Sequence, residues 1–380
     1  MPGHPVNCRG PLVAKWAFRK GAKSTEVPMF LSSIATALPD KRYTRSDCWE
    51  AFKASEWFAR LDARSHAIAQ MVLTRDNGME ERWLSVDSLD EVFAINADVL
   101  HRRFATHAPR LATAAGLAGL RGAGMDAEQI DAVIVTTCTG YLCPALSGYI
   151  IERLGLRRDV LAFDLVGQGC AGAIPNWQLA SALLAGRQSD HVLSICVEVS
   201  SAAMFLDDDP GVLISACLFG DGAGAAILSR CQPPTRRRVE WQQTASLIDP
   251  SQREALRFEH REGMLRNILT RAVPRLAAQY AQALLTTMLE RAQLEQYSIR
   301  EWIFHAGGRD VLIALQEGLG LPPQALRYSR DALRRYGNLS SAFVYFVLEA
   351  ALADRASGGW WWLSSFGAGF SCHGALLAVE

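Results

Sequence analysis

The sequence predicts an α/β protein built from two similar halves, and three observations support this fold class. Apolar, β-branched segments typical of buried strands alternate with segments typical of helices along the chain. Residues 218–229 and 365–380 each contain a Phe-Gly pair, a glycine turn and a small-residue apolar strand. Residues 167–185 and 336–352 each place a glycine-containing turn before an apolar helix, so the chain carries the pattern of an internal duplication.

The predicted elements follow in the same order in both halves. In the first half, the sequence predicts a helical stretch to about residue 125 and a helix at 176–187. The predicted strands are 29–36, 133–140, 160–173, 191–199 and 222–229, and the third of these runs into a small-residue turn. In the second half, the chain is expected to form a strand at 302–308, a helix–turn–helix at 331–354 and a strand–turn–strand at 360–380.

Two segments are expected to lie outside the regular elements. Residues 1–28 are basic and lack the apolar core of a signal peptide, which predicts a mobile N-terminal tail. The proline-containing, charged segment 231–241 is where we place the junction, with one half at 29–235 and the other at 236–380.

Composition narrows the class of protein. The chain has 380 residues, of which 49% are hydrophobic, and its 39 basic and 39 acidic side chains give a net charge of zero. That balance gives no reason to expect nucleic-acid binding. The sequence shows no run of about 18 apolar residues, so no membrane span is expected. Nine cysteines without regular spacing favour a reducing, cytoplasmic setting.

Cys170 is the strongest candidate for a catalytic residue. It lies in VGQGCAGA, at a predicted strand-to-helix turn, and Gly or Ala at 169, 171, 172 and 173 leaves its sulfur uncrowded. The positive end of the helix dipole lowers the pKa of a thiol placed there, so we expect a reactive thiolate.

His305 and Asn338 are the candidate partners of Cys170. His305 ends a predicted strand and is followed by Ala306, Gly307 and Gly308, while Asn338 lies in YGNLSS at a predicted helix start. An imidazole and an amide can donate hydrogen bonds jointly to a thioester oxygen and stabilise an enolate. Taken singly, a turn histidine or a Gly-Asn asparagine is usually structural; the order and matching turns of the three favour catalysis.

Five segments resemble the type III polyketide synthases, the chalcone and stilbene synthase superfamily, particularly its bacterial-type members: VGQGCAG, LFGDGAGA, FHAGGRDVL, YGNLSSA and SFGAGF. The resemblance implies the thiolase fold, a duplicated five-layer αβαβα arrangement. It implies that Cys170 is acylated by a starter thioester, while His305 and Asn338 promote decarboxylation of malonyl-CoA. Phe219 matches the family's gatekeeper at the mouth of the pantetheine tunnel. The implied product is a pyrone, a resorcinol or another phenolic polyketide.

The resemblance also implies further site residues. The predicted substrate cavity comprises Cys138, Thr139, Cys143, Ser200, Ala203, Arg266, Ser340 and Phe366. Plant members bind CoA phosphates with basic residues, and in the matching region this chain has only Arg64 and Arg75. The predicted CoA-binding set is these two arginines together with Gly307 and Gly308. A homodimer is implied, in which the loop at Cys143-Pro144 reaches into the partner's cavity.

Alternatives remain open at this point. The sparse basic residues also fit a ketoacyl synthase III-like enzyme that uses acyl-carrier-protein thioesters, with the same Cys-His-Asn set. Thiolases use a second cysteine near the C-terminus, and Cys372 superficially fits, although it lies within a predicted strand. No metal is expected, since Cys138 and Cys143 are not followed by a second ligand pair, and no cofactor is expected beyond the thioester substrates.

Overall fold

The computed structural model describes residues 28–233 and 237–380. The predicted mobile tail therefore lies outside the described residues, apart from position 28. The predicted junction adjoins residues 234–236, which are also outside them, so the boundary between the halves stays a prediction.

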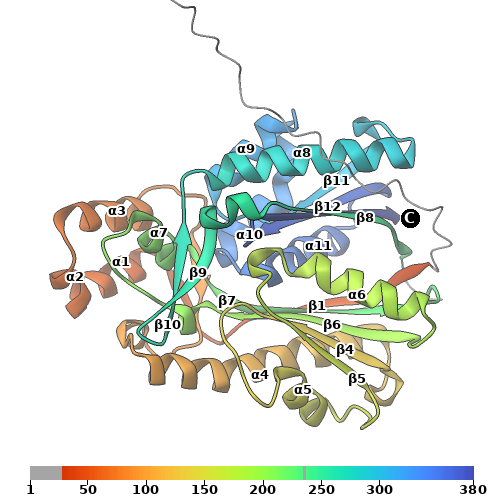
Figure 1. The fold of residues 1–380 in the computed structure, drawn as a ribbon, viewed down its shortest axis with the longest axis horizontal. Helices are drawn as coiled ribbons and strands as arrows, with labels where there is room; N and C mark the ends of the chain where they lie inside the picture. Colours follow the sequence, from red (N-terminus) through yellow and green to blue (C-terminus); the bar gives the residue numbers. More distant parts are fainter. Residues whose placement is uncertain (1–27, 234–236) are drawn as a thin grey trace, which may run out of the picture.

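The described strands of the main sheet number nine, and each half repeats one pattern (Figure 1). The first half contains β1 (Met29–Ala37), β4 (Ala132–Thr136), β5 (Leu161–Leu165), β6 (His191–Val199) and β7 (Asp221–Ser229). The second half contains β8 (Val239–Ile248), β11 (Ile299–Phe304), β12 (Gly359–Gly367) and β13 (Ser371–Val379). The order is β11-β12-β13-β8-β1-β7-β6-β4-β5.

The pairing directions match between the halves. Strand β4 runs parallel to β6, and β7 pairs antiparallel with both β6 and β1. Likewise β11 runs parallel to β12, and β13 pairs antiparallel with both β12 and β8. The halves join where β1 pairs with β8 at Met29–Trp241 and Phe30–Glu240. This topology confirms the internal duplication that the sequence indicated.

Helices complete five layers, which Figure 1 shows stacked one above another. Helices α4 (Ala97–Ala123) and α5 (Leu146–Leu154) cover the outer face of the first half, and α8 (Val273–Ala292) and α9 (Arg309–Gly318) cover that of the second. Between the two parts of the sheet lie α6 (Ala173–Ala185) and α11 (Phe343–Ala353). The thiolase-type αβαβα arrangement is therefore confirmed.

Smaller elements gather at one end of the layers. They are α1 (Arg45–Ala54), α2 (Glu56–Arg60), α3 (Ala63–Thr74), α7 (Pro210–Leu218) and α10 (Arg327–Tyr336), with the strand pairs β2 (Arg42–Thr44)–β3 (Glu81–Trp83) and β9 (Leu256–Arg261)–β10 (Met264–Leu269). The sequence analysis did not predict either two-stranded sheet. Among the described residues, no helix combines the length and apolar character needed to cross a bilayer.

The two middle-layer helices approach closely because their first turns are made of small residues. A Cβ atom at Gly172 would lie 2.4 Å from Thr136 Cγ2 and 3.4 Å from Ser341 Cβ, so only glycine fits there without a shift. Ser341 belongs to the turn before α11, and Gly172 to the turn before α6. The close approach brings the predicted Cys170 turn against the predicted Asn338 turn.

Candidate active site

Cys170 lies on a short 3-10 turn, η3 (Gly169–Ala171), that leads into α6. Gly169 adopts φ 55°, in the left-handed region where a side chain is strained. A Cβ at Gly169 would also lie 3.0 Å from the Ala368 backbone nitrogen. These two constraints fix the turn, and the Cys170 side chain on it is only 9% exposed.

Asn338 is held by backbone and side-chain contacts to two other predicted site segments. Its backbone N–H donates to Leu218 O at 2.9 Å and its carbonyl accepts from Gly220 N at 3.0 Å, which places Phe219 beside it. Its Nδ2 donates to Gly307 O at 3.2 Å, two residues beyond His305. Asn338 Oδ1 accepts from Ser340 N at 2.8 Å, which shapes the turn η8 (Ser340–Ala342).

His305 follows β11 directly and is 0% exposed. The rings of Phe343 and Phe366 form T-shaped pairs with its ring, with centroids 5.4 Å and 5.0 Å away. Neither ring nitrogen has a hydrogen-bond partner among the described residues. Burial lowers the pKa of His305 to about 3, so the imidazole is neutral and its ring N–H can donate a hydrogen bond.

These three turns meet. The Cys170 turn η3 packs against both η8 and the end of β12. A Cβ at Gly367, next to Phe366, would lie 2.5 Å from the Ala171 backbone nitrogen. Phe366 thus connects the His305 ring to the Cys170 turn, and Ser340 connects that turn to Asn338. The structure brings Cys170, His305 and Asn338 into one neighbourhood drawn from both halves.

We expected the helix dipole to lower the pKa of the Cys170 thiol, and the structure contradicts this prediction. Burial raises the pKa of the Cys170 thiol to about 12; a hydrogen bond with the Ser340 side chain opposes this rise, while the Glu198 carboxyl adds to it. The expectation failed because it considered the helix end without the desolvation of a buried sulfur. A protonated Cys170 therefore needs a base to become nucleophilic.

Glu198 is a site residue that the sequence analysis missed. It is fully buried and accepts hydrogen bonds from Cys138 N at 3.0 Å and Thr139 Oγ1 at 2.9 Å, and from Ser341 Oγ. Burial raises the pKa of its carboxyl. A glutamate inside the apolar run ICVEV was the available signal, because a charged residue in a buried strand requires partners.

A cavity lies beside Cys170, which is one of its lining residues. Six other residues of the predicted set line it: Cys138, Thr139, Ser200, Ala203, Phe219 and Ser340. Phe366 does not line it but packs behind it against His305.

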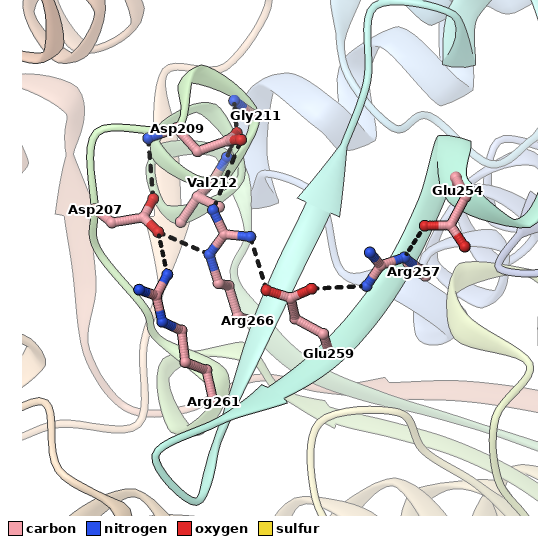
Figure 2. A network of polar contacts seen from close by, with 9 residues as sticks. All are labelled: Asp207, Asp209, Gly211, Val212, Glu254, Arg257, Glu259, Arg261 and Arg266. Atoms are coloured by element: carbon pink, nitrogen blue, oxygen red, sulfur yellow. Dashed lines mark hydrogen bonds and ion pairs between the residues drawn. The ribbon is translucent and has the colours of Figure 1, made fainter.

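Arg266 was predicted to line the cavity, and this is wrong. Its guanidinium turns to the opposite face of the β9–β10 hairpin, where Nε lies 2.7 Å from Asp207 and Nη1 lies 2.9 Å from Glu259. Figure 2 shows this arginine between the two carboxylates. The next residue, Asn267, lines the cavity instead, because successive residues of a strand point to opposite faces.

His305 and Asn338 do not line this cavity, and the other predicted residues also lie outside it. Arg64 lies on α3 and Arg75 directly follows this helix, and both are exposed. Gly307 and Gly308 form the turn between His305 and α9. Cys143 is exposed in the loop before α5.

Comparisons with known proteins agree with this geometry. A family model described as FAE1/Type III polyketide synthase-like protein matches residues 103–287, and one described as Chalcone and stilbene synthases, C-terminal domain matches residues 240–378. The chain is 29% identical over 354 residues to 1,3,6,8-tetrahydroxynaphthalene synthase of Streptomyces peucetius subsp. caesius, covering 91% of this chain and 92% of that one.

A solved structure supports the fold separately. PKS-I from the brown alga Ectocarpus siliculosus superposes with a TM-score of 0.86 at 22% identity, covering 94% of this chain and all of its own. At that identity the match supports the thiolase fold alone. The two family models and the curated relative carry the assignment: the chain belongs to the type III polyketide synthases of the chalcone and stilbene synthase family, which are acyl-transferring condensing enzymes.

Proposed function

We propose that Cys170 carries the growing acyl chain, and that His305 and Asn338 serve both its loading and its extension by malonyl-CoA. The observation that carries this proposal is His305, fully buried with both ring nitrogens unpartnered among the described residues. Buried polar atoms normally have partners, so two unpartnered ring nitrogens favour a role in binding a ligand. Phe219, fixed next to Asn338 and lining the cavity, is the proposed gatekeeper.

Loading begins with the neutral Cys170 thiol and the neutral His305 imidazole. His305 takes the thiol proton as the sulfur attacks the carbonyl carbon of an acyl thioester. The tetrahedral intermediate then expels CoA thiolate, which takes the proton from His305 and leaves as CoASH. The acyl group remains on Cys170 as a new thioester. Burial disfavours the charged form of both groups, so the proton must move to His305 while the sulfur attacks rather than beforehand.

Extension uses His305 and Asn338 together as hydrogen-bond donors. Malonyl-CoA loses CO2, and the electron pair of the broken C–C bond forms the enolate of acetyl-CoA. His305 and Asn338 donate hydrogen bonds to the enolate oxygen, where one such donor is worth about 3 kcal/mol. The enolate carbon attacks the acyl-Cys170 carbonyl and the Cys170 thiolate leaves, so the chain grows by two carbons.

The test is turnover of malonyl-CoA by the purified chain, alone and with a panel of acyl-CoAs. We expect CO2 release, a mass increase on Cys170 and polyketide products detected by mass spectrometry. Acylation without decarboxylation, or no acylation at all, would contradict the proposal.

The product we propose is a small phenolic polyketide. The relative's name states 1,3,6,8-tetrahydroxynaphthalene, a polyhydroxylated aromatic, and the lining of this cavity has hydroxyl, thiol and amide groups among its apolar ones. Comparison of the products with authentic phenols and pyrones by chromatography and mass spectrometry tests this. A purely aliphatic product would contradict it.

We propose CoA thioesters as donors, with no further cofactor. The guanidinium groups of Arg45 and Arg309 donate to the carbonyls of Arg75 and Asp76, so three arginines surround one exposed loop. Arg309 follows Gly308, whose Cβ would lie 3.5 Å from Leu218 beside Phe219. Such a cluster suits a phosphate. If instead only carrier-protein thioesters load Cys170, the ketoacyl synthase III-like alternative is favoured.

We propose a homodimer. Tyr141 is 74% exposed, and Cys143, Pro144 and Ala145 are exposed after it, while Leu142 packs against the core of its own half, so only part of this loop is left for a partner to cover. Strand β5 ends the order of the sheet, with Leu161 and nearby Val166 exposed. An unpaired apolar edge strand is a template for a second copy. Sedimentation should show a dimer, and Cys143→Trp should change product length; a fully active monomer would contradict this.

We also propose a cytoplasmic location. The cysteines of the described residues are all free thiols, as expected in a reducing compartment. Fractionation of cells that express the chain tests this location, and recovery in the secreted fraction would contradict it.

A further inference from the structure

Asn267 is a buried polar side chain on the cavity wall that no step above uses. The residue is 8% exposed, lines the cavity, and its Oδ1 is buried without a hydrogen-bond partner among the described residues. Ser200 lines the same cavity, and its Oγ is buried and unpartnered in the same way. The strand that carries Asn267, β10, packs against η4 (Ser200–Ala203). The two orphaned oxygens therefore belong to neighbouring elements of one wall.

The hairpin register explains why Asn267 faces the cavity. Asn267 pairs with Phe258, and directly opposed residues share a face; both line the cavity. The adjacent pair, Arg266 and Glu259, lies on the other face, where Arg266 also contacts Asp207 and, at 3.7 Å, Asp209 (Figure 2). The Arg266 side chain is only 11% exposed. This ion-pair network fixes the hairpin, so Arg266 acts as a positioning residue for Asn267.

Ser200 is anchored from a different direction. The next residue, Ser201, donates from its backbone N–H at 2.8 Å and from its hydroxyl at 2.6 Å to the buried Asp221. Two independent anchors, Asp221 for η4 and Arg266 for β10, thus hold the Ser200 and Asn267 side chains in place. Rigid placement of unpaired polar atoms costs stability, which is the pattern of a site that a ligand completes.

We propose that Asn267 and Ser200 form a polar subsite that binds an oxygen of the growing poly-β-ketoacyl chain. Such a chain carries a carbonyl or enol oxygen on alternate carbons, and each can accept from the Asn267 amide or the Ser200 hydroxyl; its enols can donate to Oδ1. An aliphatic acyl chain offers no such oxygen beyond its thioester. The inference rests on the proposed condensation at Cys170 and names the part of the wall that selects oxygenated chains.

The test compares Asn267→Leu, which keeps a similar volume without polar atoms, with wild-type enzyme supplied with malonyl-CoA. The readout is the ratio of the longest product to truncated products, by liquid chromatography and mass spectrometry, together with intact-mass analysis of Cys170. We expect that ratio to fall about tenfold, the effect of one lost hydrogen bond to a bound ligand. Ser200→Ala should shift the ratio in the same direction.

Ser189→Ala is the matched control. Ser189 Oγ is also buried without a partner among the described residues, but it does not line the cavity. It should leave the product ratio unchanged. If Asn267→Leu fails to fold, Ser200→Ala carries the test alone. An unchanged product ratio in a folded variant whose Cys170 is acylated overturns the subsite, whereas wild-type enzyme without acylation at Cys170 overturns the proposed function itself.

Discussion

The turns that open the two middle-layer helices occupy equivalent places in the duplicated fold but carry different chemistry. The turn before α6 carries Cys170, near the buried carboxyl of Glu198. The turn before α11 follows Asn338, whose side chain is tied to the loop after His305. Strand β4 leads to Thr137, whose hydroxyl donates to Glu198, while the equivalent strand β11 leads to His305, which has no partner among the described residues.

This difference indicates that the two halves perform different tasks. The first half holds the atom that forms a covalent bond, within a network of hydrogen bonds that is already satisfied. The second half holds the His305 imidazole, whose ring nitrogens have no partner among the described residues, and Asn338, whose side chain is tied to the Gly307 carbonyl. Burial acts in opposite directions on the two titrating groups, raising the pKa of Cys170 and lowering that of His305. Both are consequently uncharged until a thioester arrives, which avoids placing isolated charges in an apolar interior.

Removing the nucleophile tests the first half and should have the largest effect. Cys170→Ala should abolish acylation and product formation while the chain still folds, because alanine fits the same turn. Intact-mass analysis after incubation with acyl-CoA measures it. Cys372→Ala is the control: Cys372 is also a buried thiol, with its pKa raised by burial to about 12, but it lies in β13 and should not be needed for loading. Full acylation of Cys170→Ala would contradict the assignment.

Removing the donors tests the second half. His305→Ala or Asn338→Ala should each slow malonyl-CoA decarboxylation by about 10²–10³-fold, the cost of one oxyanion donor. The double variant should lose far less than the product of the two factors, because residues that act on one oxyanion are not additive. Rates of CO2 release measure this. Multiplicative losses would show that the two residues serve separate steps.

Much of this comparison could be predicted from the sequence. Cys170, His305 and Asn338 stand at strand or helix ends beside glycines, and such turns leave a short-range signal in the sequence. Strands such as β6 (His191–Val199) were predicted because apolar, β-branched runs mark buried strands. The duplicated topology followed from matching motifs.

What could not be predicted depends on long-range packing. The β9–β10 hairpin was not predicted, and the resemblance placed Arg266 on the cavity wall. A difference of one residue exchanges it for Asn267, because successive residues of a strand point to opposite faces. The direction of the Cys170 pKa shift was wrong because burial by the surrounding fold, which a local sequence pattern does not show, raises this pKa, and the charge of the distant Glu198 raises it further. Glu198 was missed because its partners come from two other loops.

The burial of His305 predicts that the free energy of unfolding depends on pH, an effect that the Cys170 turn of the first half lacks in this pH range. Its pKa falls from 6.5 to about 3 on folding, so below pH 6.5 the unfolded chain binds a proton that the folded chain does not. The free energy of unfolding should therefore decrease as pH drops through this window, by about 1.4 kcal/mol per pH unit from this group. Urea unfolding of wild type and His305→Gln between pH 4.5 and 7 measures it.

His373 supplies the control for this slope. Burial lowers its pKa to about 4, and it lies in β13 with Nδ1 2.8 Å from Ser246 Oγ. His373→Gln should reduce the pH slope in a similar way while decarboxylation continues, whereas His305→Gln should lose both. Equal slopes in wild type and His305→Gln would show that the imidazole is not held neutral in the fold.

Disturbing the close contact between the turn before α6 and the turn before α11 should have the smallest effect. In Gly172→Ala the new methyl group would meet Thr136 Cγ2 at 2.4 Å, and overpacking of this kind costs about 1–3 kcal/mol of unfolding free energy. Adding Thr136→Ser removes that methyl but keeps the hydroxyl that accepts from Asn176 Nδ2 at 2.9 Å, so the double variant should recover most of the loss. Gly148→Ala is the control, since nothing lies within 4 Å of its Cβ position, and it should not destabilise. Additive losses in the double variant would mean that the halves do not depend on this contact.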